Sequence, residues 1–173
     1  MMRYGIAIFP SREIQNEANQ YRKRYDPSYA LIPPHITLKD SFQMDEQKIE
    51  EMITQLKYIA NEVQPFTIEV KKVSTFAPVT NTIYFKIEPH ESLTTLHEKM
   101  HKNFFTDKRE HSFVPHITIA QDLVSQEYSD VYGSLQMKEI QFEEEIDRFQ
   151  LLYQLENGQW TVYETFVFGK EHV

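Results

Sequence analysis

The sequence predicts an α+β protein of two similar lobes, and two observations support this prediction. The expected elements repeat, because each half of the chain reads as strand, helix, strand, helix and strand. The phrase Pro-His-Ile-Thr also occurs twice, at 34–37 and at 115–118. Two units of similar mixed content are expected to pack as lobes related by a pseudo-twofold axis. We predict one bilobal domain over 1–173, with repeats of approximately 1–76 and 81–155.

The first repeat is predicted from apolar periodicity and from capping residues. Ser11 can cap a helix, and a stripe of apolar residues from Ile49 to Val63 has helical spacing, with Pro65 as its stop. Alternation of apolar and polar residues indicates the strands. The expected elements are, in order, a strand at 3–9, a helix at 11–25, a strand at 32–39, a helix at 45–63 and a strand at 66–76.

The second repeat follows the same order and ends in a hairpin. Asn157-Gly158 separates two alternating runs, which is typical of a type I′ turn between antiparallel strands. The expected elements are a strand at 82–88, a helix at 92–105, a strand at 112–120, a helix at 125–137, and hairpin strands at 149–155 and 160–166.

Each copy of the repeated phrase presents a histidine and a threonine on one face of a strand. Side chains two residues apart in a strand share a face, so His35 lies beside Thr37 and His116 beside Thr118. Imidazole exchanges protons near neutral pH, and a threonine hydroxyl donates a hydrogen bond without adding charge. Two such pairs facing one cleft would suit a phosphodiester, whose cleavage needs proton transfer and held phosphoryl oxygens. One copy alone indicates little, but a fold repeat does not require a histidine in both halves.

Composition restricts the partners of the chain. The 173 residues carry a net charge of −8, which disfavours wrapping of long nucleic acid. We therefore expect a small nucleotide or an RNA-end phosphodiester as substrate. The chain has no cysteine, which excludes disulfides and thiolate metal sites and fits a cytoplasmic location. Its first residues are too short an apolar stretch for a signal peptide or a membrane span, so we expect no membrane partner.

At this point the sequence resembles the two-histidine (2H, HxTx) phosphoesterase superfamily, which includes 2′-5′ RNA ligases and cyclic nucleotide phosphodiesterases. The resemblance covers essentially the whole chain and is strongest to a YjcG-like bacterial branch. It rests on the two His-x-Thr motifs, each preceded by proline and followed by an aliphatic residue. It implies a bilobal, LigT-like fold in which two antiparallel β-sheets line a central cleft, with helices packed outside.

The resemblance also implies residue roles. His35 and His116 would be the proton donor and acceptor, in an order that the sequence leaves open, and Thr37 and Thr118 would hold phosphate oxygens. The chemistry would be metal-independent hydrolysis of 2′,3′-cyclic phosphates or 2′,5′ linkages, with no cofactor. Phe76-x-Pro78 with Ile83-Tyr84-Phe85 resembles the family segment that places an aromatic ring near the ligand, and Tyr84 is the candidate for it. Lys39 departs from the apolar residue common at its position and is a further candidate substrate contact.

Two alternatives remain open. The same fold could be a non-catalytic module that binds nucleotides or phosphate. A zinc peptidase is a weaker alternative, because His97, Glu98 and His101 match the pattern H-E-x-x-H, with Glu110 or Glu127 as the third ligand.

Two further groups of residues are expected to be structural. The basic runs Arg22-Lys23-Arg24 and Lys71-Lys72 are interpreted as solvated faces. The aromatic residues near the end of the chain are expected in the core and not as a base-stacking platform; they are Trp160, Tyr163, Phe166 and Phe168.

Overall fold

Strands of the chain form two antiparallel sheets in the computed structural model, which describes residues 2–105 and 112–169. Sheet A has the order β2-β1-β7-β8, and sheet B has the order β5-β4-β3-β6. The strands of sheet A are β1 (Met2–Ile8), β2 (Ile36–Met44), β7 (Arg148–Gln154) and β8 (Trp160–Val167). The strands of sheet B are β3 (Phe66–Thr75), β4 (Ile83–Ile87), β5 (His116–Ala120) and β6 (Phe142–Ile146).

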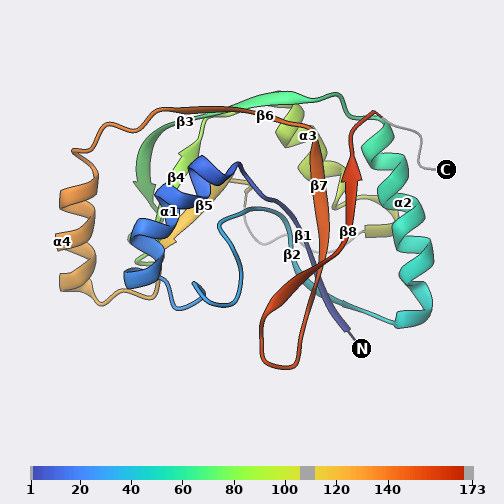
Figure 1. Cartoon of the computed structure of the whole chain (residues 1–173), viewed down its shortest axis with the longest axis horizontal. Coiled ribbons are helices and arrows are strands. Elements are labelled where there is room, and N and C mark those ends of the chain that lie inside the picture. Colours follow the sequence, from blue (N-terminus) through green and yellow to red (C-terminus); the bar gives the residue numbers. More distant parts are fainter. Residues whose placement is uncertain (1, 106–111, 170–173) are drawn as a thin grey trace.

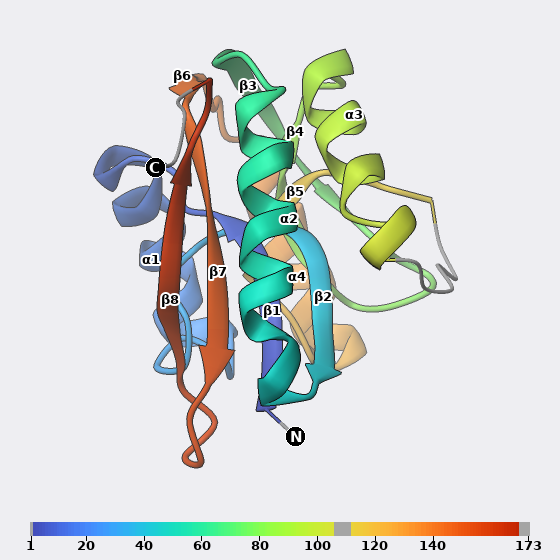
Figure 2. The same ribbon diagram turned by 90° about the vertical axis from the view of Figure 1, so that its right-hand side faces the viewer.

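Helices cover the outer surfaces of the two sheets. Figure 1 shows α2 and α4 at opposite ends of the long axis, and Figure 2 shows α2 in front of the strands of sheet A. α1 packs against β5, and α3 contacts β2. The α-helices are α1 (Arg12–Tyr25), α2 (Ile49–Asn61), α3 (Glu91–Lys99) and α4 (Ser125–Leu135), with short 3₁₀ turns at Glu46–Lys48 and Asn103–Phe105. The predicted α+β class and its two antiparallel sheets with outer helices are confirmed.

Each sheet combines strands from both halves of the chain. β3, the last strand of the first half, pairs with β4, and β7 from the second half pairs with β1. The third strand of the first half, β3, therefore belongs to sheet B, and the third strand of the second half, β7, belongs to sheet A. This exchange ties the lobes together, while the boundaries of the sequence repeats remain a prediction.

The two histidine strands begin at their motifs. β2 starts at Ile36, one residue after His35, and β5 starts at His116. Both begin later than predicted, because the prolines that precede each histidine have no N–H to donate to a sheet. Ile36 and Ile117 are fully buried, so the intervening isoleucine of each motif anchors it to the core, as expected.

Further elements differ from the prediction. β6 was not expected, and β2 extends to Met44 instead of ending at 39. The helix expected at 92–105 ends at Lys99, and residues 103–105 form a separate 3₁₀ turn that begins at Asn103, which has positive φ. The predicted hairpin exists, but its turn is not type I′, because only Gly158 of the Asn157-Gly158 pair has positive φ. Gly158 N–H bonds to the carbonyl of Leu155, which is typical of a type I turn followed by a glycine bulge. None of the helices in the described ranges is long and apolar enough to cross a membrane.

Candidate active site

Both His-x-Thr motifs line one cavity of about 360 Å³. His35 and Thr37 come from the start of β2, and His116 and Thr118 come from β5 in the other sheet. The structure thus brings together four side chains that the sequence separates into two distant pairs. The remaining lining residues are Gly5, Ile6, Ala7, Arg22, Asp26, Ser28, Ile32, Lys39, Asp40, Ser41, Gln121, Leu152 and Trp160.

Each histidine is held in the same way by the backbone two residues before it. The Nδ1 of His35 lies 2.8 Å from the carbonyl oxygen of Pro33, and that of His116 lies 2.7 Å from the carbonyl oxygen of Val114. A carbonyl oxygen only accepts, so Nδ1 carries the proton in both rings. The hydrogen bond at Nδ1 therefore fixes the tautomer of each ring. Nε2 can then take a proton when the ring is neutral or donate one when the ring is charged.

Burial lowers the pKa of both histidines below the ordinary value for imidazole. The hydrogen bond to Pro33 partly offsets this effect on the pKa of His35, while the charges of Arg22 and His116 lower that pKa further. For the pKa of His116, the bond to Val114 and the carboxylate of Asp40 act in the opposite direction to burial.

The threonines lie on paired strands beside the histidines. Thr37 pairs with Ala7 on β1, and Thr118 pairs with Tyr84 on β4. Both threonines are partly exposed and line the cavity. Both threonines therefore lie on the wall of the cavity that also contains the two histidines.

A buried ion pair supports the loop that carries His35. The Nε of Arg22 lies 3.0 Å from Asp26, and both side chains are 2% exposed. The same guanidinium donates to the carbonyl oxygens of Ser28 at 3.4 Å and Ile32 at 2.6 Å. Gln121, which follows β5, donates to the other oxygen of Asp26 at 2.7 Å. The pair therefore joins α1 to the segments next to both histidine motifs.

This finding corrects the expectation for the first basic run. Lys23, Arg24, Lys71 and Lys72 are exposed as predicted, but Arg22 is buried and lines the cavity. The signal was present in the sequence, because Arg22 continues the four-residue spacing of the buried Ile14 and Ala18. An acidic partner four residues later, Asp26, is at the spacing of a helix ion pair.

Lys39, one of the two further substrate contacts suggested by the sequence, lines the same cavity as the histidines but is buried. A bulge places Ala7 opposite Thr37 but Ile6 opposite Lys39, which breaks the simple alternation along β2. Although Lys39 borders the cavity, its ammonium is buried and donates to the carbonyl oxygen of Phe105 at 3.2 Å. The ammonium of Lys39 is therefore engaged in the interior, and a substrate contact by Lys39 stays a prediction.

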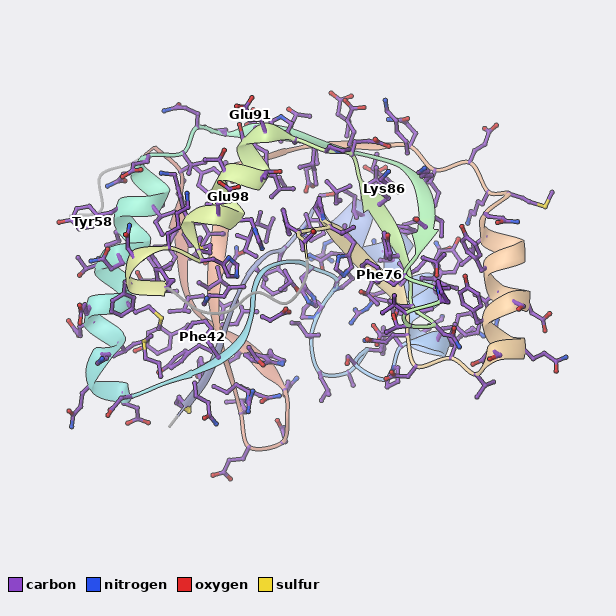
Figure 3. The ribbon with its side chains drawn as sticks, turned by 180° about the vertical axis from the view of Figure 1, so that it is seen from behind. Phe42, Tyr58, Phe76, Lys86, Glu91 and Glu98 are labelled. Carbon is purple, nitrogen blue, oxygen red and sulfur yellow. The ribbon has the colours of Figure 1, made fainter. Side chains whose placement is uncertain are left out.

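Two aromatic rings pack against His116. One of them belongs to Tyr84, the other substrate contact that the sequence suggested. Tyr84 is buried and its ring centroid lies 5.1 Å from that of His116, while Phe76 meets the same imidazole edge-on at 5.0 Å. Figure 3 labels Phe76 next to the strands of sheet B. Tyr84 is not among the residues that line the cavity, so its contact with His116 indicates a supporting position.

The aromatic residues near the end of the chain divide into two groups. Phe166 and Phe168 are in the core, as expected. Tyr163 is 44% exposed, and Trp160 is partly exposed and lines the cavity beside the histidines. The expectation of a core position was wrong for these two, because alternation along β8 does not reveal which face the cavity occupies.

The H-E-x-x-H match does not form a helix face with two metal ligands. α3 ends at Lys99, before His101, and the ring of His97 is buried and stacked on Phe113 at 3.8 Å between centroids. His101 uses Nδ1 for the carbonyl oxygen of His97. No group of three or more histidine, aspartate or glutamate residues that could hold a metal occurs within 2–105 and 112–169. Glu127 is exposed on α4, and Glu110 lies outside the described residues.

Fold and site together define a class of protein: two antiparallel sheets with outer helices and a pair of histidines on the wall of one shared cavity. The family model of the 2′-5′ RNA ligase superfamily matches residues 10–158. The chain belongs to this superfamily, and it is a phosphodiesterase-type enzyme.

Similar proteins were found by sequence and by structure. The chain is 59% identical to a protein of Oceanobacillus iheyensis named "Putative phosphoesterase", over 98% of this chain and all of that protein. It is 58% identical to one of the same description from a Geobacillus species, over 97% of each. By fold it matches E. coli LigT complexed with 3′-AMP, with a TM-score of 0.72, 16% identity, and coverage of 98% and 99%. It also matches TT0787 of Thermus thermophilus, with a TM-score of 0.70, 19% identity, and coverage of 99% and 100%.

Proposed function

We propose that this protein hydrolyses 2′,3′-cyclic phosphate or 2′,5′-phosphodiester bonds of nucleotides or RNA ends, by paired-histidine acid–base catalysis without a metal. One observation carries the proposal. His35 and His116, from different sheets, line one cavity, and each has its Nδ1 bound to a carbonyl oxygen so that Nε2 is available.

The proposed step is an in-line displacement at phosphorus. One neutral imidazole takes a proton from water through Nε2, and the water oxygen forms a bond to phosphorus. The bond from phosphorus to the ribose oxygen breaks, and the second, protonated imidazole delivers a proton to that leaving oxygen. Thr37 and Thr118 donate hydrogen bonds to the non-bridging oxygens, where negative charge increases. Each acid–base contribution of this kind is worth about 10²–10⁴-fold in rate.

The two histidines have similar surroundings. Burial lowers the pKa of both rings, and a carboxylate acts in the opposite direction on each pKa, Asp26 for His35 and Asp40 for His116. Either ring can therefore serve as the base while the other serves as the acid, and the two roles exchange when the reaction runs in the opposite direction.

The comparisons support the proposed substrate class. Structures of LigT, which this fold matches, are described as complexes with 3′-AMP, ATP and phosphate. A cavity of about 360 Å³ lies at the small end of the range for small-molecule sites. The net charge of −8 also favours a small ligand or a nucleic-acid end over a long strand.

Phosphorus NMR of the purified protein with 2′,3′-cyclic AMP and with a 2′,5′-linked diadenosine monophosphate tests the proposal. We expect hydrolysis of the cyclic phosphate to 2′-AMP or 3′-AMP, or of the dinucleotide to adenosine and AMP, at the same rate with and without EDTA. Binding of both compounds with no turnover would instead establish a binding module. Activity that EDTA abolishes and zinc restores would contradict the metal-independent mechanism.

A further inference from the structure

Trp160 occupies a position that acid–base chemistry does not require. It is the first residue of β8, it is partly exposed, and it lines the cavity that contains His35 and His116. It is also the only tryptophan in the chain. A large aromatic ring on the wall of a polar cavity needs an explanation, because water is a poor partner for its π-face.

The indole extends across sheet A. Trp160 is on β8, and Gly5 is on β1, with β7 between them. Neighbouring strands are about 4.8 Å apart, so these two strands are separated by about 10 Å. Nevertheless, the Cζ3 of Trp160 lies 3.6 Å from the point that a Cβ of Gly5 would occupy. The ring must therefore extend along the sheet towards β1, because a side chain perpendicular to the sheet would not reach it.

The residue between them fits this arrangement. Leu152 on β7 pairs with Gly5, lines the cavity, and is only 2% exposed although it is outside the main core cluster. An indole lying across β7 accounts for its burial. Such a ring has one face on the sheet and leaves the opposite face available to the cavity.

The backbone connects Trp160 to the segment that carries His35. The N–H of Trp160 donates to the carbonyl oxygen of Leu31 at 2.8 Å, four residues before that histidine. Ile32, the next residue, is in turn held by Arg22. The backbone of Trp160 is therefore held by hydrogen bonds next to the segment that carries His35.

The separation along β1 matches the dimensions of a nucleotide. Ala7 pairs with Thr37, the residue proposed to hold phosphate oxygens, and Gly5 is two residues further along the same strand. Two residues of an antiparallel strand span about 7 Å. A ribose bridges a comparable distance between its phosphate and its base. A phosphate between the histidines would thus place a base over the floor formed by Gly5 and the indole.

We propose that Trp160 forms a stacking subsite for the nucleobase of the substrate. The inference rests on the proposed function, and it narrows the substrate class to phosphodiesters that carry a base next to the scissile group. Stacking on an aromatic ring tolerates every base, because each has a π-face. The subsite therefore confers a preference for nucleotides over base-free phosphodiesters and little preference among the four bases.

Fluorescence of the single tryptophan provides a direct test. We expect 3′-AMP to quench the emission of the full-length protein in a saturable way, because the base stacks on the indole. Inorganic phosphate and ribose 5-phosphate should bind without comparable quenching. Saturable quenching by phosphocholine but not by 3′-AMP would overturn the proposal, since the indole would then serve a cationic group.

Calorimetry of Trp160 variants measures how much the indole contributes to the affinity for 3′-AMP. Trp160→Ala should weaken binding of 3′-AMP by about tenfold or more, while the affinity for inorganic phosphate stays within about twofold. Trp160→Phe should retain most of the affinity for 3′-AMP, and it covers the case in which the alanine variant does not fold. Tyr58→Ala is the matched control, because Tyr58 is 60% exposed on the outer side of α2 and points away from the body in Figure 3.

The outcomes separate this inference from the proposed function. Equal loss of affinity for 3′-AMP and phosphate in Trp160→Ala, or no loss for either, would overturn the stacking subsite even if the wild type hydrolyses cyclic phosphates. Quenching by 3′-AMP and selective loss in Trp160→Ala would support the subsite even if no hydrolysis occurs. Absence of any binding of 3′-AMP by the wild type would overturn the subsite.

Discussion

The guanidinium of Arg22 donates to the carbonyl oxygen of Ile32 at 2.6 Å, and this bond joins the end of α1 to the loop that delivers His35. The same side chain forms a buried ion pair with Asp26, which in turn accepts from Gln121 after the second motif. One residue of the first helix therefore contributes to the geometry of both histidine segments.

Replacing Arg22 should destabilise the protein strongly. Arg22→Met leaves the carboxylate of Asp26 buried without its cation, and we expect a loss of about 3–5 kcal/mol in the free energy of unfolding. Urea denaturation measures this loss. Lys23→Met, at the exposed neighbouring position, should change stability by no more than about 0.5 kcal/mol. The double variant Arg22→Met/Asp26→Leu should be more stable than Arg22→Met alone, and an additive result would contradict a coupled pair.

The pH dependence of activity should be displaced to the acid side. Burial lowers the pKa of both His35 and His116, and the reaction needs one neutral and one protonated ring. We expect a bell-shaped profile of kcat/KM with its maximum below about pH 6.5, the ordinary pKa of imidazole. Titration of the ring resonances by NMR checks the cause. Ring pKa values at or above that of free histidine would contradict the burial argument.

The free energy of unfolding should depend on pH through the rings of His35 and His116. A histidine whose pKa is lower in the folded state than in the unfolded state binds its proton less readily when folded. The free energy of unfolding should therefore decrease as the pH falls below about 6.5, the unfolded-state pKa, until the folded-state pKa values are passed. Urea denaturation at several pH values should show a smaller decrease for His35→Ala/His116→Ala than for the wild type. Equal pH slopes in the two proteins would refute this linkage.

Removal of either threonine hydroxyl should lower kcat because a hydrogen-bond donor is lost, and not because the shape of the side chain changes. Thr37→Val and Thr118→Val keep the side-chain volume but remove a donor, and each should lower kcat by about 10²-fold. Steady-state kinetics with a 2′,3′-cyclic nucleotide gives the comparison. Thr67→Val, on the exposed face of β3, is the control and should retain wild-type kinetics. Wild-type rates in both motif variants would remove the threonines from the mechanism.

The sequence was sufficient for the features that depend on local pattern. Alternation and helical spacing predicted the order of the elements apart from β6, and the repeated phrase predicted which residues line one cavity. The pattern that makes Ile36 and Ile117 core residues is the same one that presents the neighbouring histidines and threonines on the opposite face.

Features that depend on pairing between distant strands could not be predicted from the sequence. The bulge opposite Lys39 breaks the alternation that suggested a substrate contact, and nothing in the residues around it specifies a bulge. The position of Trp160 in the cavity depends on β8 lying two strands from β1, which only the sheet order reveals. Arg22 could have been identified from its helical spacing, but its contacts with the 26–34 loop could not.

The central claim is that two imidazoles from different sheets act together on one phosphodiester. The most direct measurement is the rate of 2′,3′-cyclic nucleotide hydrolysis by His35→Ala and by His116→Ala, each with a far-ultraviolet circular dichroism spectrum to establish folding. Each folded single variant should lose at least about 10²-fold in rate. Wild-type turnover in both folded variants would contradict it.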